Sequence, residues 1–170
     1  MHPSLYRHLF LPGYSRIMGD GSLAAYNELS GHDTLTAVRV REIAEGKLRS
    51  LIAHSVAHVP YYQEVLRTRG LDAADIRSFD DLHQLPLVTK ADIRGAGERF
   101  FAQNLNRDDL VKGSTGGSSG TPFEFWHTRE DRQLLNGNLW RVNGWMGCPP
   151  GTRRARVWGC YPLTKREQLI

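Results

Sequence analysis

The chain is poor in cysteine and has no long apolar run. Its two cysteines, Cys148 and Cys160, form no C-x-x-C pair and no spacing typical of a zinc site or a disulfide framework. No stretch approaches the roughly 18 apolar residues of a membrane span. Met1 to Pro12 lack the apolar core and the cleavage site of a signal peptide. These absences predict a cytoplasmic protein with reduced thiols and without a membrane span.

The excess of positive charge is small and scattered. The 170 residues carry 22 Lys and Arg against 18 Asp and Glu, a formal net charge of +4. The densest basic cluster, Arg153, Arg154 and Arg156, alternates with apolar residues and is typical of the solvent face of a strand. This pattern favours a protein that tolerates anionic ligands and has no nucleic-acid partner. An apolar share of 40% is typical of a folded globular chain.

Residues 1–105 are predicted to be mostly helical. Asp33 or Thr34 is the expected N-cap of a long helix that runs to about Val59, where Pro60 breaks or kinks it. The other helix boundaries expected here are a stop at Gly70 and starts at the pairs Ser78/Asp81 and Thr89/Asp92, which have the Ser/Thr-x-x-acid pattern of a capping box.

Residues 106–170 are predicted to open an α/β layer. Two short strands, 110–114 and 123–127, flank a glycine-rich loop, and a helix over 129–145 and a strand over 154–161 follow. The expected fold class is therefore α/β, with a helical N-terminal region and then the first strands of a second domain. A sheet of about three strands leaves an edge and a face uncovered, so we expect the domain to be incomplete.

The loop between the two strands reads Thr-Gly-Gly-Ser-Ser-Gly-Thr-Pro, residues 115–122. Its glycines allow a close approach of the backbone to a ligand, and successive N–H groups can form an anion nest. Hydroxyl groups add further donors, so phosphate is the expected partner. The predicted phosphate-contacting residues are Thr115, Gly116, Gly117, Ser118, Ser119, Gly120 and Thr121.

Other interpretations of the loop fit less well. A Walker loop needs Gly-Lys-Ser/Thr, and a dinucleotide fingerprint needs G-x-G-x-x-G; neither is present. Residues 116–120 do satisfy G-x-S-x-G, the nucleophile elbow of serine hydrolases, but that motif requires a following helix and a later acid and His. Here Pro122 and an aromatic run follow, and His127 is the last histidine. A serine hydrolase remains a lesser alternative, as does a flexible Gly/Ser linker.

The loop resembles the phosphate-loop signature of adenylate-forming enzymes, Thr/Ser-x-Gly-Ser/Thr-Ser/Thr-Gly-x-Pro. Residues 56–94 are in addition similar to the N-terminal stretch of the phenylacetate–CoA ligase family, including its relatives in capsular-polysaccharide gene clusters. The matching positions, in order, are Pro60-Tyr61-Tyr62, Gly70-Leu71, Leu85-Pro86, Thr89-Lys90, Asp92 and Arg94. The resemblance covers roughly residues 35–160. It departs from many members at Gly116, where they carry Ser or Thr.

The resemblance implies a ligase that binds Mg·ATP and a small carboxylic acid. The carboxylate would attack the α-phosphate, pyrophosphate would leave, and the acyl-adenylate would pass to CoA or another acceptor. The loop N–H groups and the hydroxyls of Thr115, Ser118 and Ser119 would hold the pyrophosphate. The family's catalytic residues would lie beyond residue 170, so this chain alone is expected to be inactive. Aryl, fatty and amino acids all remain open as substrates.

A second class of function stays open. The chain could be a non-catalytic remnant that acts as an interaction module or a homodimer through its exposed sheet edge. His54 and His58 stand four residues apart on the long helix, but Ser55 replaces the Glu that a zinc protease needs, so no metal is expected there. Glu124, Glu130 and Asp131 are carboxylates for which solvated strand-end and first-turn positions are the favoured interpretation.

Overall fold

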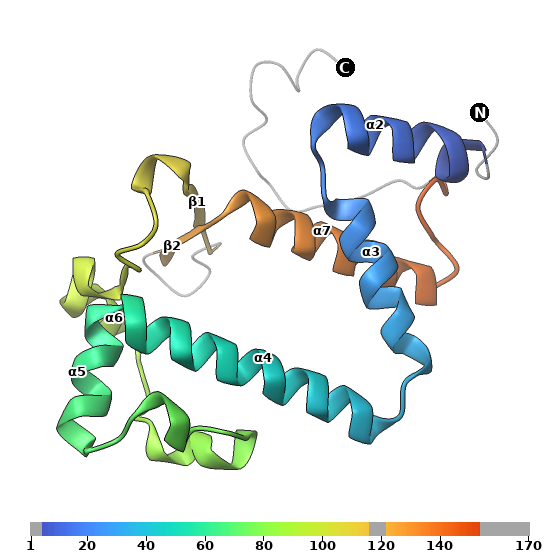
Figure 1. The fold of residues 1–170 in the computed structure, drawn as a ribbon. Helices are drawn as coiled ribbons and strands as arrows, with labels where there is room; N and C mark the ends of the chain where they lie inside the picture. Colours follow the sequence, from blue (N-terminus) through green and yellow to red (C-terminus); the bar gives the residue numbers. More distant parts are fainter. Residues whose placement is uncertain (1–4, 116–121, 154–170) are drawn as a thin grey trace.

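The computed structural model describes residues 5–115 and 122–153, which form a mostly helical chain with one small sheet (Figure 1). The α-helices are α2 (Leu11–Met18), α3 (Ser22–Gly31), α4 (Ala37–His58), α5 (Pro60–Arg69), α6 (Lys90–Ala96) and α7 (Arg129–Trp145). The strands are β1 (Val111–Ser114) and β2 (Glu124–His127). A π-helical turn η1 (Tyr6–Phe10) and the 3₁₀ turns η2 (His32–Thr34), η3 (Ala73–Asp75), η4 (Phe79–Gln84), η5 (Gly97–Phe100) and η6 (Arg107–Asp109) complete the described elements. This content fits part of an α/β protein; the strand expected over 154–161 lies outside the described residues.

The long helix α4 begins later than the sequence predicted. Thr36, and neither Asp33 nor Thr34, is its N-cap, and its side chain accepts a hydrogen bond from the backbone N–H of Arg39. Asp33 and Thr34 belong instead to the 3₁₀ turn η2. The predicted cap was therefore wrong by two or three residues, because Leu35 and Thr36 adopt an extended conformation before the helix starts.

The predicted break at Pro60 is confirmed. Pro60 is the first residue of α5, a position where its missing N–H costs no helical hydrogen bond. The same helix stops at Gly70, which has a φ of 66°. A left-handed residue at this place is the usual end of a helix and favours glycine.

Both predicted capping boxes are present. Ser78 with Asp81 starts the 3₁₀ turn η4, and Thr89 with Asp92 starts α6. In each box the carboxylate accepts hydrogen bonds from the hydroxyl and the backbone N–H of the capping residue. The pKa of each carboxyl is consequently lowered, chiefly by the bond from its hydroxyl partner, so both remain charged at neutral pH.

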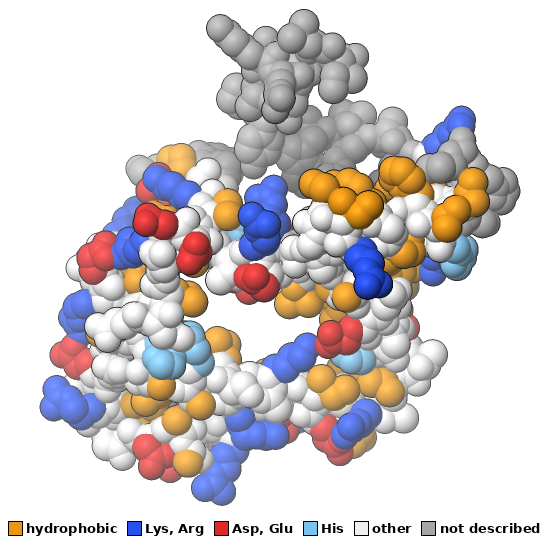
Figure 2. All heavy atoms as spheres, turned by 45° about the horizontal axis from the view of Figure 1, so that its top comes forward, with side chains coloured by type: hydrophobic (Ala, Val, Ile, Leu, Met, Phe, Trp, Pro, Cys, Tyr) orange, Lys and Arg blue, Asp and Glu red, His pale blue; other side chains and the backbone are white. Residues whose placement is uncertain are grey.

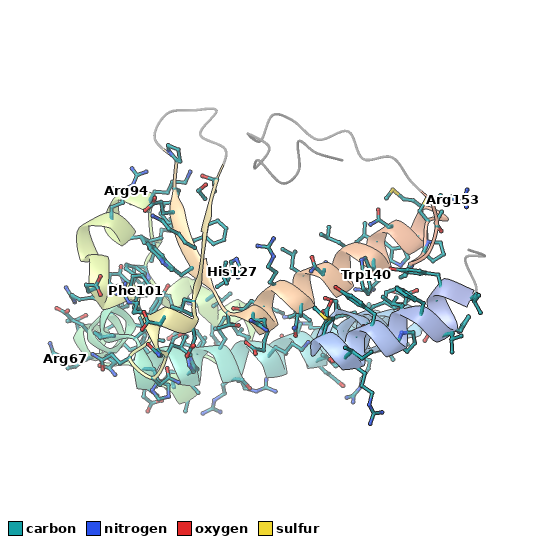
Figure 3. All side chains as sticks on the ribbon, turned by 90° about the horizontal axis from the view of Figure 1, so that it is seen from above. Arg67, Arg94, Phe101, His127, Trp140 and Arg153 are labelled. Atoms are coloured by element: carbon teal, nitrogen blue, oxygen red, sulfur yellow. The ribbon has the colours of Figure 1, made fainter. Side chains whose placement is uncertain are left out.

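The N-terminal helices dock on α7. The helices α3 and α7 cross closely at Gly137, because a Cβ there would lie 2.7 Å from the backbone nitrogen of Tyr26. Tyr26 packs edge-on against Trp140 with ring centroids 6.4 Å apart, and Arg7 donates to its hydroxyl at 3.2 Å. Trp140 lies between α7 and the N-terminal helices in Figure 3. Residues more than a hundred positions apart thus share one packed region.

A second packed region surrounds the end of α4 and the start of α5. Its buried side chains include Ile52, Val59, Leu66 and Ile76. Arginines from the helices reach backbone carbonyls of the following loops: Arg49 bonds to the carbonyl of residue 77 at 2.9 Å, and Arg69 to that of residue 84 at 2.8 Å. The 3₁₀ turns over 73–84 are therefore fixed to α4 and α5.

The two packed regions frame an opening. Figure 2 shows it between the part that contains α4 and the part that contains α7. The hairpin of β1 and β2 stands at one end of this frame and leads through Thr128 directly into α7 (Figure 1).

Candidate functional site

The glycine-rich loop is carried by an antiparallel hairpin, as predicted. Strands β1 and β2 pair in the register Val111–His127, Lys112–Trp126, Gly113–Phe125 and Ser114–Glu124. Two strands with a regular register give the loop fixed ends, whereas a flexible linker would have none.

The last described contact before the loop joins Thr115 and Phe123. The backbone N–H of Thr115 donates to the carbonyl of Phe123 at 2.9 Å, and the N–H of Phe123 donates to Thr115 Oγ1 at 3.1 Å. Of the predicted phosphate-contacting residues, Thr115 is placed at the mouth of the hairpin; Gly116–Thr121 lie outside the described residues. Since Thr115 Oγ1 acts as the acceptor here, its own proton remains available for a ligand.

An aromatic contact fixes the base of the hairpin. Phe101 meets Trp126 edge-on with ring centroids 4.9 Å apart, and the guanidinium of Arg107 lies 3.3 Å from the centroid of the Phe101 ring. Arg107 is in turn paired with Glu98. Figure 3 shows Phe101 beside the hairpin. The segment before the strands therefore holds the base of the hairpin, and no local pattern in the sequence pointed to these residues.

One lysine belongs to the hairpin and another lies close to it. Lys112 forms an ion pair with Glu124 across the strands at 2.7 Å, and its ammonium is 5.7 Å from the Trp126 ring centroid. Lys90, at the start of α6, lies 5.9 Å from the ring centroid of Phe123. Both put positive charge near the strands that hold the loop. Glu124 is thereby a strand residue with a partner, in agreement with its expected structural role.

The hairpin also depends on one glycine. A Cβ on Gly113 would lie 2.6 Å from the ring of Phe125, its partner in the register. The aromatic ring thus covers the strand at the position that lacks a side chain, an arrangement known to stabilise glycine in sheets.

A groove of about 880 Å³ lies between the hairpin and the segment from α6 to η6. Apolar and aromatic side chains dominate its wall, with Arg94, Arg107 and Glu98 among the few charged ones. Its size and lining are those of pockets that accept small organic groups. The apolar side chains of the wall include Val59, Ile93, Phe100, Phe101, Leu105, Leu110, Phe123 and Trp126.

The other candidate residues have structural partners. The rings of His54 and His58 are 4.9 Å apart, and His54 Nε2 lies 3.4 Å from the side-chain nitrogen of Asn104. Asp131 completes the capping box of α7 with Thr128. Within residues 5–115 and 122–153, no group of three His, Cys, Asp or Glu side chains is arranged to bind a metal ion.

None of the described helices combines the length and the apolar content needed to cross a bilayer.

Comparison with known proteins agrees with the resemblance of residues 56–94. No protein-family model matches the chain. The chain is similar to a phenylacetate-coenzyme A ligase of Thermus thermophilus, with 25% identity over 128 residues. The aligned region covers 75% of this chain and 28% of that ligase, so the chain spans little more than a quarter of the length of this curated relative.

Proposed function

We propose that this chain is the part of an ATP-dependent carboxylate–CoA ligase that binds the phosphates of the nucleotide. The observation that carries the proposal is the hairpin contact between Thr115 and Phe123, at the two ends of a loop rich in Gly and Ser. A loop of this composition held at both ends can direct successive N–H groups toward one anion. The similarity to a phenylacetate-coenzyme A ligase supplies the class of reaction.

The proposed phosphate donors are hydroxyl and backbone N–H groups. Thr115 Oγ1 accepts from the N–H of Phe123, which leaves the hydroxyl proton free to donate to a phosphate oxygen. Ser118, Ser119 and the N–H groups of residues 116–121 complete the set on the strength of the sequence signature. Bonds from neutral donors to a phosphate are charge-assisted and stronger than bonds between neutral groups.

The proposed reaction activates a carboxylic acid. A carboxylate oxygen forms a bond to the α-phosphorus of ATP, and the bond from that phosphorus to pyrophosphate breaks. The products are an acyl-adenylate and free pyrophosphate. The task of the loop in this reaction is to hold negative charge as it accumulates on the leaving phosphates. Mg²⁺ and CoA belong to the proposal through the similarity alone, because the described residues provide no metal-binding group. The domain division at about residue 105, with the loop in the second part, is part of the same proposal.

Titration of the chain with ATP tests this function. We expect Thr115→Val and Ser119→Ala to weaken ATP binding about tenfold each, since a hydrogen bond to a charged group contributes roughly 1.5–3 kcal/mol. Ser50→Ala is the matched control, because the Ser50 hydroxyl bonds to the carbonyl of Gly46 within α4. Calorimetry would measure the three dissociation constants beside that of the unmodified chain.

The absence of ATP binding by the unmodified chain would contradict the proposal. If the chain also self-associated, the interaction-module alternative would replace it. A substrate-dependent exchange of pyrophosphate into ATP would show in addition that the chain carries catalytic residues, which we do not propose for a chain spanning 28% of the ligase it resembles.

A further inference from the structure

The segment 5–18, which comprises η1 and α2, exposes six large apolar side chains. Leu11 is buried against the rest of the molecule, whereas Ile17 is 83% exposed and Leu9 is 69% exposed. Figure 2 shows hydrophobic side chains gathered on this part of the molecule. Exposed apolar patches of this kind mark interaction surfaces. The exposed large apolar residues of the segment are Leu5, Leu9, Phe10, Tyr14, Ile17 and Met18.

Aromatic rings form a row along this surface. The rings of Tyr6 and Phe10 are stacked with centroids 5.5 Å apart, and those of Phe10 and Tyr14 are stacked at 6.4 Å. The spacing of four residues places them one above another on the same side of the helical segment. Tyr prefers the boundary between hydrocarbon and water, and Phe is typical of the apolar face of helices that lie at that boundary.

The charge of the segment is of one sign. Residues 5–19 contain no Asp or Glu, and the first acid in the chain is Asp20. Arg16 is exposed, as is His8. Arg7 is half-buried, donates to the hydroxyl of Tyr26 and lies 5.7 Å from the centroid of its ring. The same face of a second copy would offer Arg16 no acidic partner, whereas a negatively charged surface would be attracted to it.

We propose that η1 and α2 form a membrane-surface helix that lies on bilayers containing anionic lipid. An exposed apolar side with aromatic rings, accompanied by basic residues and no acids, is the pattern of helices that lie in the interface plane of a membrane. Leu9, Ile17 and their apolar neighbours enter the headgroup region, and Arg16 contacts lipid phosphates. The inference is independent of the nucleotide-binding proposal.

Sedimentation with lipid vesicles tests the proposal. We expect the chain to sediment with vesicles that contain phosphatidylglycerol mixed with phosphatidylcholine, and to remain in solution with phosphatidylcholine alone. Added NaCl should weaken the binding, because salt screens the attraction between Arg16 and the lipid phosphates. Failure to bind phosphatidylglycerol vesicles, or equal binding to both kinds of vesicle, would overturn the proposal.

Substitutions assign the binding to this segment. Ile17→Asp should lower the partition coefficient at least about tenfold, since it removes a large apolar side chain from the lipid contact. Arg16→Gln should lower it about fivefold, the effect of one basic residue at an anionic surface. Leu87→Asp is the control: Leu87 is 96% exposed and lies in the loop before α6. Unchanged binding by Ile17→Asp, or equal losses in Ile17→Asp and Leu87→Asp, would overturn the assignment.

Two control measurements examine the folding of the variants and the oligomeric state of the chain. Circular dichroism must give the same helix content for Ile17→Asp and the unmodified chain; if the variant is unfolded, Arg16→Gln decides, because an exposed Arg-to-Gln change leaves the packing intact. Sedimentation equilibrium without lipid should show a monomer. A dimer that Ile17→Asp dissociates would overturn the proposal in favour of a second copy on this face.

Discussion

Single residues decide how closely the chain can pack. Gly137 is buried where α7 crosses α3, and the atoms nearest to its missing Cβ include backbone atoms of Ser22 and Tyr26, both closer than 3 Å. The Cβ of Ala25 is equally close, at 2.7 Å. Backbone atoms and a Cβ cannot move aside as the end of a flexible side chain can. The absence of one methyl group therefore sets the distance between the two helices.

Gly137→Ala should destabilise the protein by about 1–3 kcal/mol, because the added methyl group forces α3 away from α7. Gly144→Ala is the matched control in the same helix: its Cβ would meet no atom within 4 Å. That variant should gain up to about 1 kcal/mol, the usual advantage of Ala over Gly in a helix. Urea denaturation measures both; equal effects would show that the two helices do not pack tightly at Gly137.

Helix ends are the features that the sequence predicted best. Thr89 and Asp92, like Ser78 and Asp81, carry both halves of a capping box within four residues, so the contact is local and visible in the sequence. Thr36 lacks the second half of this pattern, because Arg39 occupies the position where an acid would complete the capping box. Its role as a cap became apparent only from the structure.

Thr36→Ala tests the corrected start of α4. We expect a loss of about 1 kcal/mol, the usual contribution of a Thr N-cap. Thr34→Ala should leave the free energy of unfolding nearly unchanged, because Thr34 ends the 3₁₀ turn before the helix. If Thr34→Ala proved the more harmful change, the cap would lie where the sequence first indicated.

The candidate site was only partly predictable. The hairpin and its loop follow from the alternation of apolar residues and from the glycines, which are local signals. Phe101 and Arg107 contact the hairpin from a separate segment, and nothing in the spacing of residues predicts that pairing. Such contacts depend on how the elements dock, which a single sequence does not encode in a local pattern.

At the scale of the whole molecule, one ionic cluster joins the connection after α3 to the last turns of α7. Asp33 in η2 accepts hydrogen bonds from Arg141 at 2.7 Å and from the indole of Trp145 at 3.0 Å, both in α7. The guanidinium of Arg141 also lies 4.8 Å from the centroid of the Trp145 ring. The cluster holds the last turns of α7 against the connection from α3 to α4.

Two hydrogen bonds lower the pKa of Asp33 below its ordinary value: the larger effect comes from Arg141 and the smaller from Trp145. A carboxyl whose folded pKa is lowered contributes stability above its unfolded pKa of about 3.9, and this contribution is lost as pH falls through the folded pKa.

Asp33→Asn should therefore lower Tm at pH 7, with a difference from the unmodified chain that shrinks in acid. Asp80→Asn is the control, because Asp80 pairs with Arg41 in an 84% exposed position where ion pairs contribute little. Thermal melts across the acid range measure both variants. If the charge of Asp33 matters, the Tm difference must follow the titration of its carboxyl. A difference for Asp33→Asn that stays constant down to the lowest pH measured would contradict this and show that the side chain acts by shape and hydrogen bonding.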